Sequence, residues 1–356
     1  MERFEKFTQL AARTDGFEAA IITSEANKYY LSGIRTPEAG TAVITKDCAY
    51  FIVDSRYIEV VENSVKTAKV ILQGKLYSQI DEILKKHGVK TVRAENSLTL
   101  GEYSALEKTI GAKVVTDFPL TDILAQMRAV KDDAELALIK TAQEITEAGF
   151  DFICTRLAPG KKESDMALEL EYFMRKNGAD GLSFPTILIS GAKTSMPHGV
   201  PSDKIIEKGD FVTMDYRAAY GGYCTDMTRT VAIGCVTDEM RRVYDTVLKA
   251  QTAALENAKP GMTGAQIDKL ARDVIYGAGY EGYFGHSLGH SYGIEIHEKP
   301  YFSPNDASFI KEGMLITVEP GIYLPGKFGV RIEDTVRMCE NGCENLTHSP
   351  KNLIIL

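Results

Sequence analysis

Two stretches of the chain share one pattern, Ile206-Glu-Lys-Gly-Asp-Phe-Val-Thr-Met-Asp215 and Ile310-Lys-Glu-Gly-Met-Leu-Ile-Thr-Val-Glu319. Glycine, threonine and a final acid fall at matching positions in the two copies. Each copy continues through a turn to a second acid, Asp226 in the first and Glu333 in the second, and two segments with helical periodicity precede each copy. The pattern predicts a domain of two related halves, each ending in paired strands that carry acids.

The four acids of this repeat are the first candidates for a functional site. Asp215 follows the apolar run 211–214 and Glu319 follows the run 314–318, so both strands are predicted to be interior. A single acid at a strand end is more often a solvated surface group. Four acids at matching places indicate a common site instead, because buried carboxylates are costly unless a cation or a donor meets them. Divalent metal ions are the simplest compensation.

Four of the six histidines lie in glycine-bearing segments of the same region. His198 stands in Ser195-Met-Pro-His-Gly199, and His286, His290 and His297 share one short stretch. A lone histidine would more often be a hydrogen-bonded structural residue than a ligand, but three in one stretch favour a site. One imidazole with four carboxylates is a hard, oxygen-rich ligand set that suits a pair of Mn²⁺, Co²⁺, Fe²⁺ or Zn²⁺ ions.

The front of the chain shows a different organisation, in which helical and strand patterns alternate. Residues 17–23 predict a buried strand, residues 41–45 and 49–53 predict a hairpin, and residues 78–87 predict a helix. Residues 122–152 keep one long helical period, which is expected to link the two domains. The sequence therefore predicts an α/β domain over residues 1–122 and a second domain over residues 123–356.

In the second domain, the patterns predict both helices and strands. Helices are expected at 165–176, 238–257 and 264–277, and strands at 187–190 and 211–216. From residue 285 onward, the pattern is strand and turn, rich in glycine.

Composition narrows the partners and the location. The formal net charge is −8 and no long basic run offsets it, so no nucleic-acid partner is expected. Acids stand where a signal peptide needs an apolar core, and no apolar stretch approaches membrane-spanning length, so we expect no membrane partner and a cytoplasmic location. The six cysteines are scattered without a C-x-x-C pair and are expected to be free thiols.

Six motifs of the second domain together resemble the pita-bread metallopeptidases, and among them the Xaa-Pro dipeptidase (prolidase) and aminopeptidase P branch. The front part, with Ala26-Asn-Lys-Tyr-Tyr-Leu-Ser-Gly33, resembles the creatinase-type N-terminal domain of that branch. The resemblance implies an α/β creatinase-like N-terminal domain and an α+β pita-bread domain with a pseudo-twofold internal repeat. The six motifs are Gly191-Ala-Lys-Thr-Ser-Met-Pro-His-Gly199, Met214-Asp-Tyr216, Tyr223-Cys-Thr-Asp-Met-Thr-Arg-Thr230, Gly285-His-Ser-Leu-Gly-His290, Val318-Glu-Pro-Gly-Ile-Tyr323 and Gly329-Val-Arg-Ile-Glu-Asp334.

The resemblance also implies a ligand set for two divalent metal ions, with Mn²⁺ or Co²⁺ expected. Asp226 and Glu333 would bridge the two ions, and Glu319 would bind the same ion as His290. The five implied ligands are Asp215, Asp226, His290, Glu319 and Glu333. Four of them are the acids that the internal repeat selects.

The other roles that the resemblance implies concern substrate and catalysis. His198 and His297 would bind the substrate and the tetrahedral intermediate, and His286 would line the pocket for proline. Tyr323 and Arg331 would support the ligands and the substrate site. Glu319 would also move the proton when water attacks the carbonyl carbon of the residue before proline.

The implied activity is hydrolysis of the bond preceding proline in short proline-containing peptides, by a homodimer. We favour a dipeptidase because the chain is short for the branch. Tyr301 stands where some prolidases carry an arginine suited to a substrate carboxylate, which leaves an aminopeptidase P acting on Xaa-Pro-Yaa peptides open. A methionine aminopeptidase would lack the large N-terminal domain. A creatine-hydrolysing enzyme or a non-catalytic binding protein of this fold would not keep all five ligands.

Overall fold

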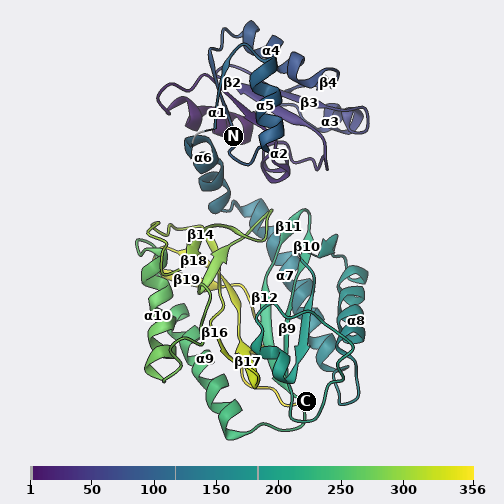
Figure 1. Cartoon of the computed structure of the whole chain (residues 1–356), viewed down its shortest axis with the longest axis vertical. Helices are drawn as coiled ribbons and strands as arrows, with labels where there is room; N and C mark the ends of the chain where they lie inside the picture. The colour runs from purple at the N-terminus through teal and green to yellow at the C-terminus, as the bar shows by residue number, and fades with distance from the viewer. Residues whose placement is uncertain (1–2, 117, 183) are drawn as a thin grey trace. The chain divides into compact units, whose positions relative to one another are not determined.

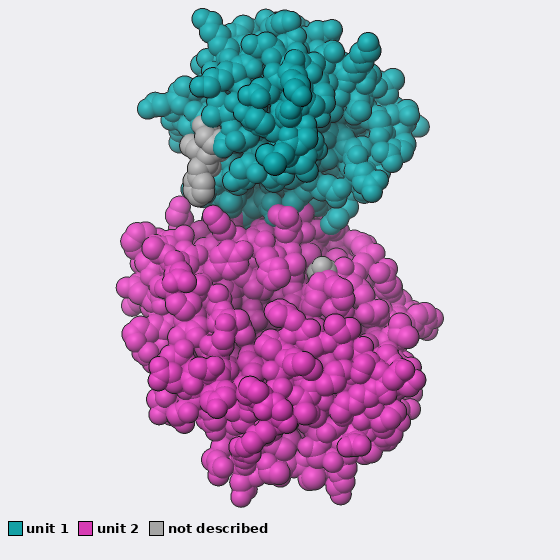
Figure 2. All heavy atoms as spheres, viewed as in Figure 1, with its two compact units in different colours: residues 1–128 teal, residues 129–356 magenta. Residues whose placement is uncertain are grey.

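Contacts within the chain divide it into two units, residues 1–128 and 129–356 (Figure 2). The computed structural model describes residues 3–116, 118–182 and 184–356. The boundary predicted between residues 122 and 123 falls inside helix α6 (Phe118–Ala129).

The first unit is built on one mixed six-stranded sheet in the order β4-β3-β2-β1-β5-β6. Strands β1, β2 and β3 are buried at every residue, which explains their nearly unbroken apolar sequences. The predicted hairpin is confirmed, since β2 and β3 pair antiparallel over the expected residues. The strands are β1 (Ala19–Ile22), β2 (Thr41–Thr45), β3 (Ala49–Val53), β4 (Lys69–Leu72), β5 (Thr91–Ala94) and β6 (Lys113–Val115).

The helices of the first unit lie between the strands of this sheet in sequence or precede them. The predicted helix at 78–87 is α4, and Gly88, at φ +65°, follows its end in the left-handed conformation that glycine adopts without strain. The helices of the first unit are α1 (Arg3–Ala12), α2 (Glu25–Ser32), α3 (Ile58–Ser64), α4 (Leu76–Lys86) and α5 (Leu100–Thr109).

The second unit repeats one order of elements: two helices and two strands, then a strand, a hairpin and a returning strand. In the first copy, β9 pairs with β12 and the hairpin β10–β11 lies between them in sequence; in the second, β15 pairs with β18 around β16–β17. The predicted repeat is therefore confirmed at the level of topology. The strands of the first copy are β7 (Gly181–Leu182), β8 (Ile187–Ser190), β9 (Phe211–Tyr216), β10 (Ala218–Tyr220), β11 (Tyr223–Cys224) and β12 (Met227–Ala232).

The second copy forms a larger sheet in the order β14-β13-β15-β18-β19, beside the β16–β17 hairpin. Its strands are β13 (Gly289–Ser291), β14 (Glu298–Phe302), β15 (Leu315–Val318), β16 (Gly321–Leu324), β17 (Phe328–Arg331), β18 (Asp334–Cys339) and β19 (Gly342–Asn345).

Helices cover the strands of the second unit from two sides (Figure 1). Helices α7 and α8 share a buried apolar cluster with β8, β9 and β12, whereas α9 and α10 share another with β15 to β18. Such a layered core leaves the strand ends of the two copies facing each other. The regular elements are α7 (Asp133–Cys154), α8 (Glu163–Lys176), the 3₁₀ turn η1 (Gly191–Ser195), α9 (Asp238–Asn257) and α10 (Gly264–Gly277).

The single helix predicted over residues 122–152 is wrong, because the chain breaks it into α6 and α7. Val130 forms a β-bridge with Met314, and the Lys131 amide donates to Gly313 O at 3.1 Å. Asp132 then begins α7 with a reciprocal capping box to Glu135. These partners lie far along the chain, so helical periodicity alone could not show the break.

No helix in the described part of the chain is long and apolar enough to cross a lipid bilayer. Within the described part of the chain, none of the six cysteines forms a disulfide, as the sequence predicts.

Two leucines on α8 test the burial of this core directly. Leu170 is 0% exposed and Leu168 is 64% exposed. We expect Leu170→Ala to lower the free energy of unfolding by about 2–5 kcal/mol, because it leaves a cavity. Leu168→Ala, the matched control, should change it by less than about 0.5 kcal/mol in urea unfolding. Equal effects of the two substitutions would contradict the packing described above.

Candidate metal centre

The acids of the repeat stand at the ends of paired strands. Asp215 lies near the end of β9, opposite Thr228 on β12, and Asp226 directly precedes β12. In the second copy Glu319 directly follows β15 and Glu333 directly precedes β18. Each strand pair therefore presents one acid from each of its strands at the same end.

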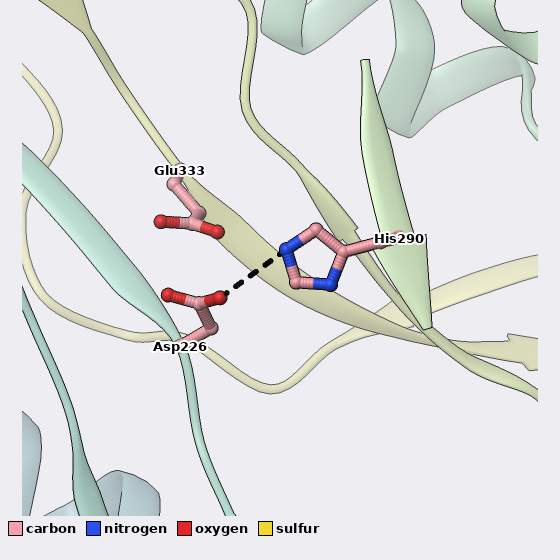
Figure 3. A group of neighbouring side chains, drawn as sticks. All are labelled: Asp226, His290 and Glu333. Atoms are coloured by element: carbon pink, nitrogen blue, oxygen red, sulfur yellow. Dashed lines mark ion pairs between the residues drawn. The ribbon is translucent and has the colours of Figure 1, made fainter. Parts of the chain in front are cut away.

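The structure brings these ends together around one histidine (Figure 3). One possible ligand atom from each of Asp226, His290 and Glu333 lies within 4.8 Å of the other two. His290 Nε2 is 3.5 Å from Asp226 Oδ2 and 3.4 Å from Glu319 Oε1. Asp215 joins the group through Arg217, which approaches both aspartates. All five predicted ligands thus meet at one place.

Burial changes the acidity of these carboxyl groups. Asp226 is 0% and Glu333 1% exposed. Burial raises the pKa of Asp226 and of Glu319 well above its usual range, and raises the pKa of Glu333 to about 7. Burial alone would also raise the pKa of Asp215, but the charges and hydrogen bonds of two arginines outweigh it and lower that pKa. Three of the four acids are therefore harder to ionise than usual, and a further cation would favour their ionised forms.

His290 is held as a neutral ring with one nitrogen facing the acids. Burial lowers its pKa to about 3. Its Nδ1 lies 3.1 Å from Ser291 O, so Nδ1 carries the proton and donates it to this carbonyl. Nε2 consequently turns a lone pair toward Asp226 and Glu319. Lone pairs that face one another across about 3.5 Å repel unless a cation or a proton lies between them.

Missing hydrogen bonds point to the same conclusion. Among the described residues, Asp226 Oδ1 and Oδ2 and Glu333 Oε1 are buried without a hydrogen-bond partner. Buried carboxylate oxygens are almost always satisfied in folded proteins, by donors or by metal ions. The donor set of one neutral imidazole and several carboxylates therefore fits a divalent cation.

A buried ion pair on helix α10 positions the loop that carries His286 and His290. Arg272 is held by Asp268, with Nε 2.6 Å from Oδ2, and donates to Phe284 O and His286 O. Asp268 also accepts from the Leu288 amide at 3.0 Å. These hydrogen bonds fix the path of the loop up to β13, although the glycine-containing loop forms no helix or strand.

Gly289 allows β13 to lie against β15 directly beside His290. A Cβ atom at this position would lie 1.9 Å from Thr317 O. The His290 amide also donates a hydrogen bond to Thr317 Oγ1 at 3.0 Å. The glycine in this motif is therefore required by the close approach that places the imidazole.

A pocket of about 200 Å³ opens above the acids. Its wall includes Asp215, Glu319 and the predicted histidines His198, His286 and His297. His290 and His297 lie with their ring centroids 4.5 Å apart. The structure thus gathers every predicted histidine of this region at one cavity.

Arg331 and Tyr323 form the network that was predicted to surround the ligands. Arg331 Nη2 lies 2.6 Å from Asp215 Oδ2, and its Nη1 donates to the Tyr323 hydroxyl at 3.1 Å. The Tyr323 hydroxyl in turn lies 2.8 Å from His286 Nε2. Tyr323 is 8% exposed and reaches the pocket wall through these two neighbours.

Sequence reasoning missed two residues of this site. Thr228 donates to Glu333 Oε2 at 2.8 Å and accepts from Arg331 Nε at 3.0 Å. Arg217 lies against Asp215 and Asp226. Strand alternation could have indicated Arg217, because residues two apart lie on the same face of a strand and Asp215 is a predicted ligand.

Comparison with known proteins identifies the families that the two parts of the chain match. Residues 137–340 match the model of metallopeptidase family M24, and residues 3–130 match the creatinase/prolidase N-terminal domain. An uncharacterized peptidase of Bacillus subtilis is 43% identical over 357 residues, 99% of this chain and 100% of its own.

Two solved structures cover the whole of this chain. An Xaa-Pro dipeptidase from Bacillus anthracis has a TM-score of 0.96 at 39% identity, with 100% of this chain and 99% of that chain covered. An X-Pro aminopeptidase from Thermotoga maritima has a TM-score of 0.91 at 37% identity, with 100% of both chains covered.

The chain therefore belongs to metallopeptidase family M24, with a creatinase/prolidase N-terminal domain. The predicted resemblance and fold class are confirmed. The cluster described above lies within the part that matches the peptidase family.

The raised pKa of Glu333 predicts a pH effect in protein treated with a chelator. A shift from 4.5 to about 7 corresponds to roughly 3 kcal/mol of stability that protonation supplies and that is lost as the pH rises through this window. Gln at this position stays neutral at every pH. We therefore expect the difference in free energy of unfolding, Glu333→Gln minus the unchanged protein, to increase as the pH rises from 4.5 to 7.

The buried histidines titrate in the same range with the opposite sign, because burial lowers their pKa values. Their contribution is common to both proteins and cancels in the difference. A difference that stays constant from pH 4.5 to 7 would contradict the raised pKa of Glu333.

Proposed function

We propose that this metallopeptidase hydrolyses the peptide bond that precedes proline, acting on Xaa-Pro dipeptides with two divalent metal ions. The observation that carries the proposal is the neutral His290 facing buried, unsatisfied carboxylates at the base of a pocket. A non-catalytic binding protein would not need this complete ligand set beside a cavity lined with histidines.

The metal ions would be held by Asp215, Asp226, His290, Glu319 and Glu333. When bound, divalent ions act as Lewis acids that polarise a peptide carbonyl and make water a nucleophile at neutral pH. A mostly carboxylate set suits Mn²⁺, which we propose as the resident ion, and also admits Co²⁺, Fe²⁺ and Zn²⁺. The resemblance further supports a homodimer, which the mass of the native protein in solution would test.

Glu319 is the acid placed to move the proton. Asp215 and Glu319 both line the pocket, but Asp215 is held by Arg217 and Arg331. Within the described part of the chain, the hydrogen bond that Glu319 accepts comes from Thr317 Oγ1, at 3.1 Å. Its carboxyl group, 15% exposed, is free to take a proton from water and deliver it to the leaving amine.

The pocket histidines divide into two kinds. Both ring nitrogens of His286 are occupied, with Nδ1 2.8 Å from Ser287 O and Nε2 2.8 Å from the Tyr323 hydroxyl. His286 would therefore offer only its ring surface, which suits contact with a proline ring. His198 and His297 are exposed at the pocket and would hydrogen-bond the substrate and stabilise the oxyanion.

The size of the pocket supports a dipeptide over a longer peptide. Sites for drug-sized ligands usually enclose about 300–1,000 Å³, and this pocket encloses about 200 Å³. Tyr301 lines the pocket where an arginine would suit a substrate carboxylate, which keeps an aminopeptidase acting on Xaa-Pro-Yaa peptides as the second candidate. Of the two similar structures described above, one is named for each of these activities.

Asp226→Asn tests the metal site. The change removes a charge at the centre of the cluster, so we expect loss of bound metal and a fall in peptide hydrolysis of more than about 100-fold. Asp273→Asn on α10, whose side chain is 60% exposed, is the matched control and should keep both properties. Elemental analysis after Mn²⁺ loading and a hydrolysis assay measure the outcome. Full metal content and activity in Asp226→Asn would refute the ligand assignment.

A substrate panel tests the specificity. Mn²⁺-loaded protein should cleave an Xaa-Pro dipeptide fastest, an Xaa-Pro-Yaa tripeptide more slowly, and a Met-Ala-Yaa peptide negligibly, because the small pocket and His286 favour a short, proline-ended substrate. Faster cleavage of the tripeptide would establish the aminopeptidase instead. Cleavage of only the Met-Ala-Yaa peptide would overturn specificity for proline.

A further inference from the structure

Three buried arginines lie beside the carboxylate cluster, and in two of them every guanidinium nitrogen donates a hydrogen bond. Arg229 donates through Nε to Pro350 O, through Nη1 to Thr228 O and Glu333 O, and through Nη2 to Asp334 Oδ1 and Ser349 O.

Arg331 also donates through each of its three guanidinium nitrogens. It donates through Nε to Thr228, through Nη1 to Pro197 O and Tyr323, and through Nη2 to Asp215. Such hydrogen bonding is what burial of a guanidinium requires, since each unpaired donor carries a desolvation cost.

Arg217 does not follow this rule. Its side chain is 7% exposed, yet among the described residues Nε and Nη1 have no hydrogen-bond partner. Nη2 donates to Asp215 Oδ1 at 3.2 Å, and Nε lies 2.8 Å from Asp226 Oδ1 without hydrogen-bond alignment. The Cζ atom lies 3.2 Å from the centroid of the Phe184 ring. Charge, rather than hydrogen bonding, holds this guanidinium in place.

The position of Arg217 conflicts with that of a metal ion. Carboxylate oxygens bind such cations at about 2.0–2.2 Å, so an ion on Asp226 Oδ1 would lie within about 5 Å of Arg217 Nε. The surroundings are buried, where like charges at this separation repel strongly. The guanidinium and the ion therefore cannot both hold these positions at low free energy.

We propose that Arg217 is a displaceable counter-ion, which lies against Asp215 and Asp226 in the metal-free enzyme and competes with the divalent cation for them. The inference rests on metal binding at the proposed ligands. Its two unbonded nitrogens mean that withdrawal breaks few hydrogen bonds, so it can yield to an ion where Arg229 and Arg331 cannot. Arg217 thereby sets how tightly the enzyme holds its metal, as a positioning residue and not a ligand.

The test measures metal affinity rather than activity. Metal-free full-length protein is titrated with Mn²⁺ by calorimetry at mildly alkaline pH, where the carboxyl groups are more fully ionised. Arg217→Met removes the charge and keeps the length, and Arg217→Gln offers a second neutral side chain should the first variant fold poorly. Arg217→Lys keeps the charge. Arg337→Met on β18 is the matched control, since Arg337 is half-buried beside Glu344 and away from the pocket.

We expect both neutral variants to bind Mn²⁺ more tightly than the unchanged protein, by at least about tenfold, because a competing charge is gone. The rise in Tm on adding Mn²⁺ should be larger in these variants, as tighter binding requires. Arg217→Lys should stay near the unchanged protein, and Arg337→Met should match it.

Two results would overturn the inference, and they are distinguishable from each other. Equal or weaker Mn²⁺ binding in Arg217→Met and Arg217→Gln, with normal binding by the unchanged protein, would refute the competition alone. Absence of Mn²⁺ binding in all the proteins would refute the proposed metal site and the competition with it.

Discussion

Burial of several carboxyl groups at one point is the constraint on which the second unit depends. Asp226 and Glu333 are essentially inaccessible, and burial raises their pKa values together with that of Glu319. Like charges so placed are tolerated only if cations or protons compensate them. The arginines beside the acids, the neutral His290 and the unsatisfied oxygen atoms all follow from this requirement.

The internal repeat is the means by which the fold meets the constraint. Each half contributes a strand, a hairpin and a returning strand, and the two halves join at the acids themselves. The Glu333 amide donates to Thr228 O at 3.1 Å while the Thr228 hydroxyl donates to Glu333. Arg229 then links the first half to the backbone of Glu333 and to the carboxylate of Asp334. These bonds fix the site where the halves meet, and helices α7 to α10 pack against the strands that carry it.

The three arginines differ in how firmly hydrogen bonds hold them at one site. Arg229 and Arg331 donate hydrogen bonds through every guanidinium nitrogen and act as fixed parts of the scaffold. Arg217 has the same charge in a similar place but lacks those bonds, and so is held less firmly. Metal affinity in such a site depends on the competing cations that the protein supplies as well as on the ligands.

Much of this organisation could be predicted from the sequence. The repeat identifies the four acids because matching positions in the two copies can be read directly from the sequence. The hairpin at 41–53 and helices α9 and α10 lie where periodicity predicts them. Arg217 and the break between α6 and α7 could not be found this way. Both depend on distant partners: Arg217 on Asp226 across the β9–β12 pair, and the break on Met314 and Gly313.

The sequence by itself determined the division into two units, the candidate ligand types and the family, since these are carried by local patterns and motifs. Only the tertiary structure decided how the ligands face one another, which nitrogen of His290 is available and which arginine lacks hydrogen bonds. The physical reason is that burial, pKa and hydrogen bonding are properties of neighbours in space. Sequence order does not specify those neighbours until the two halves have packed together.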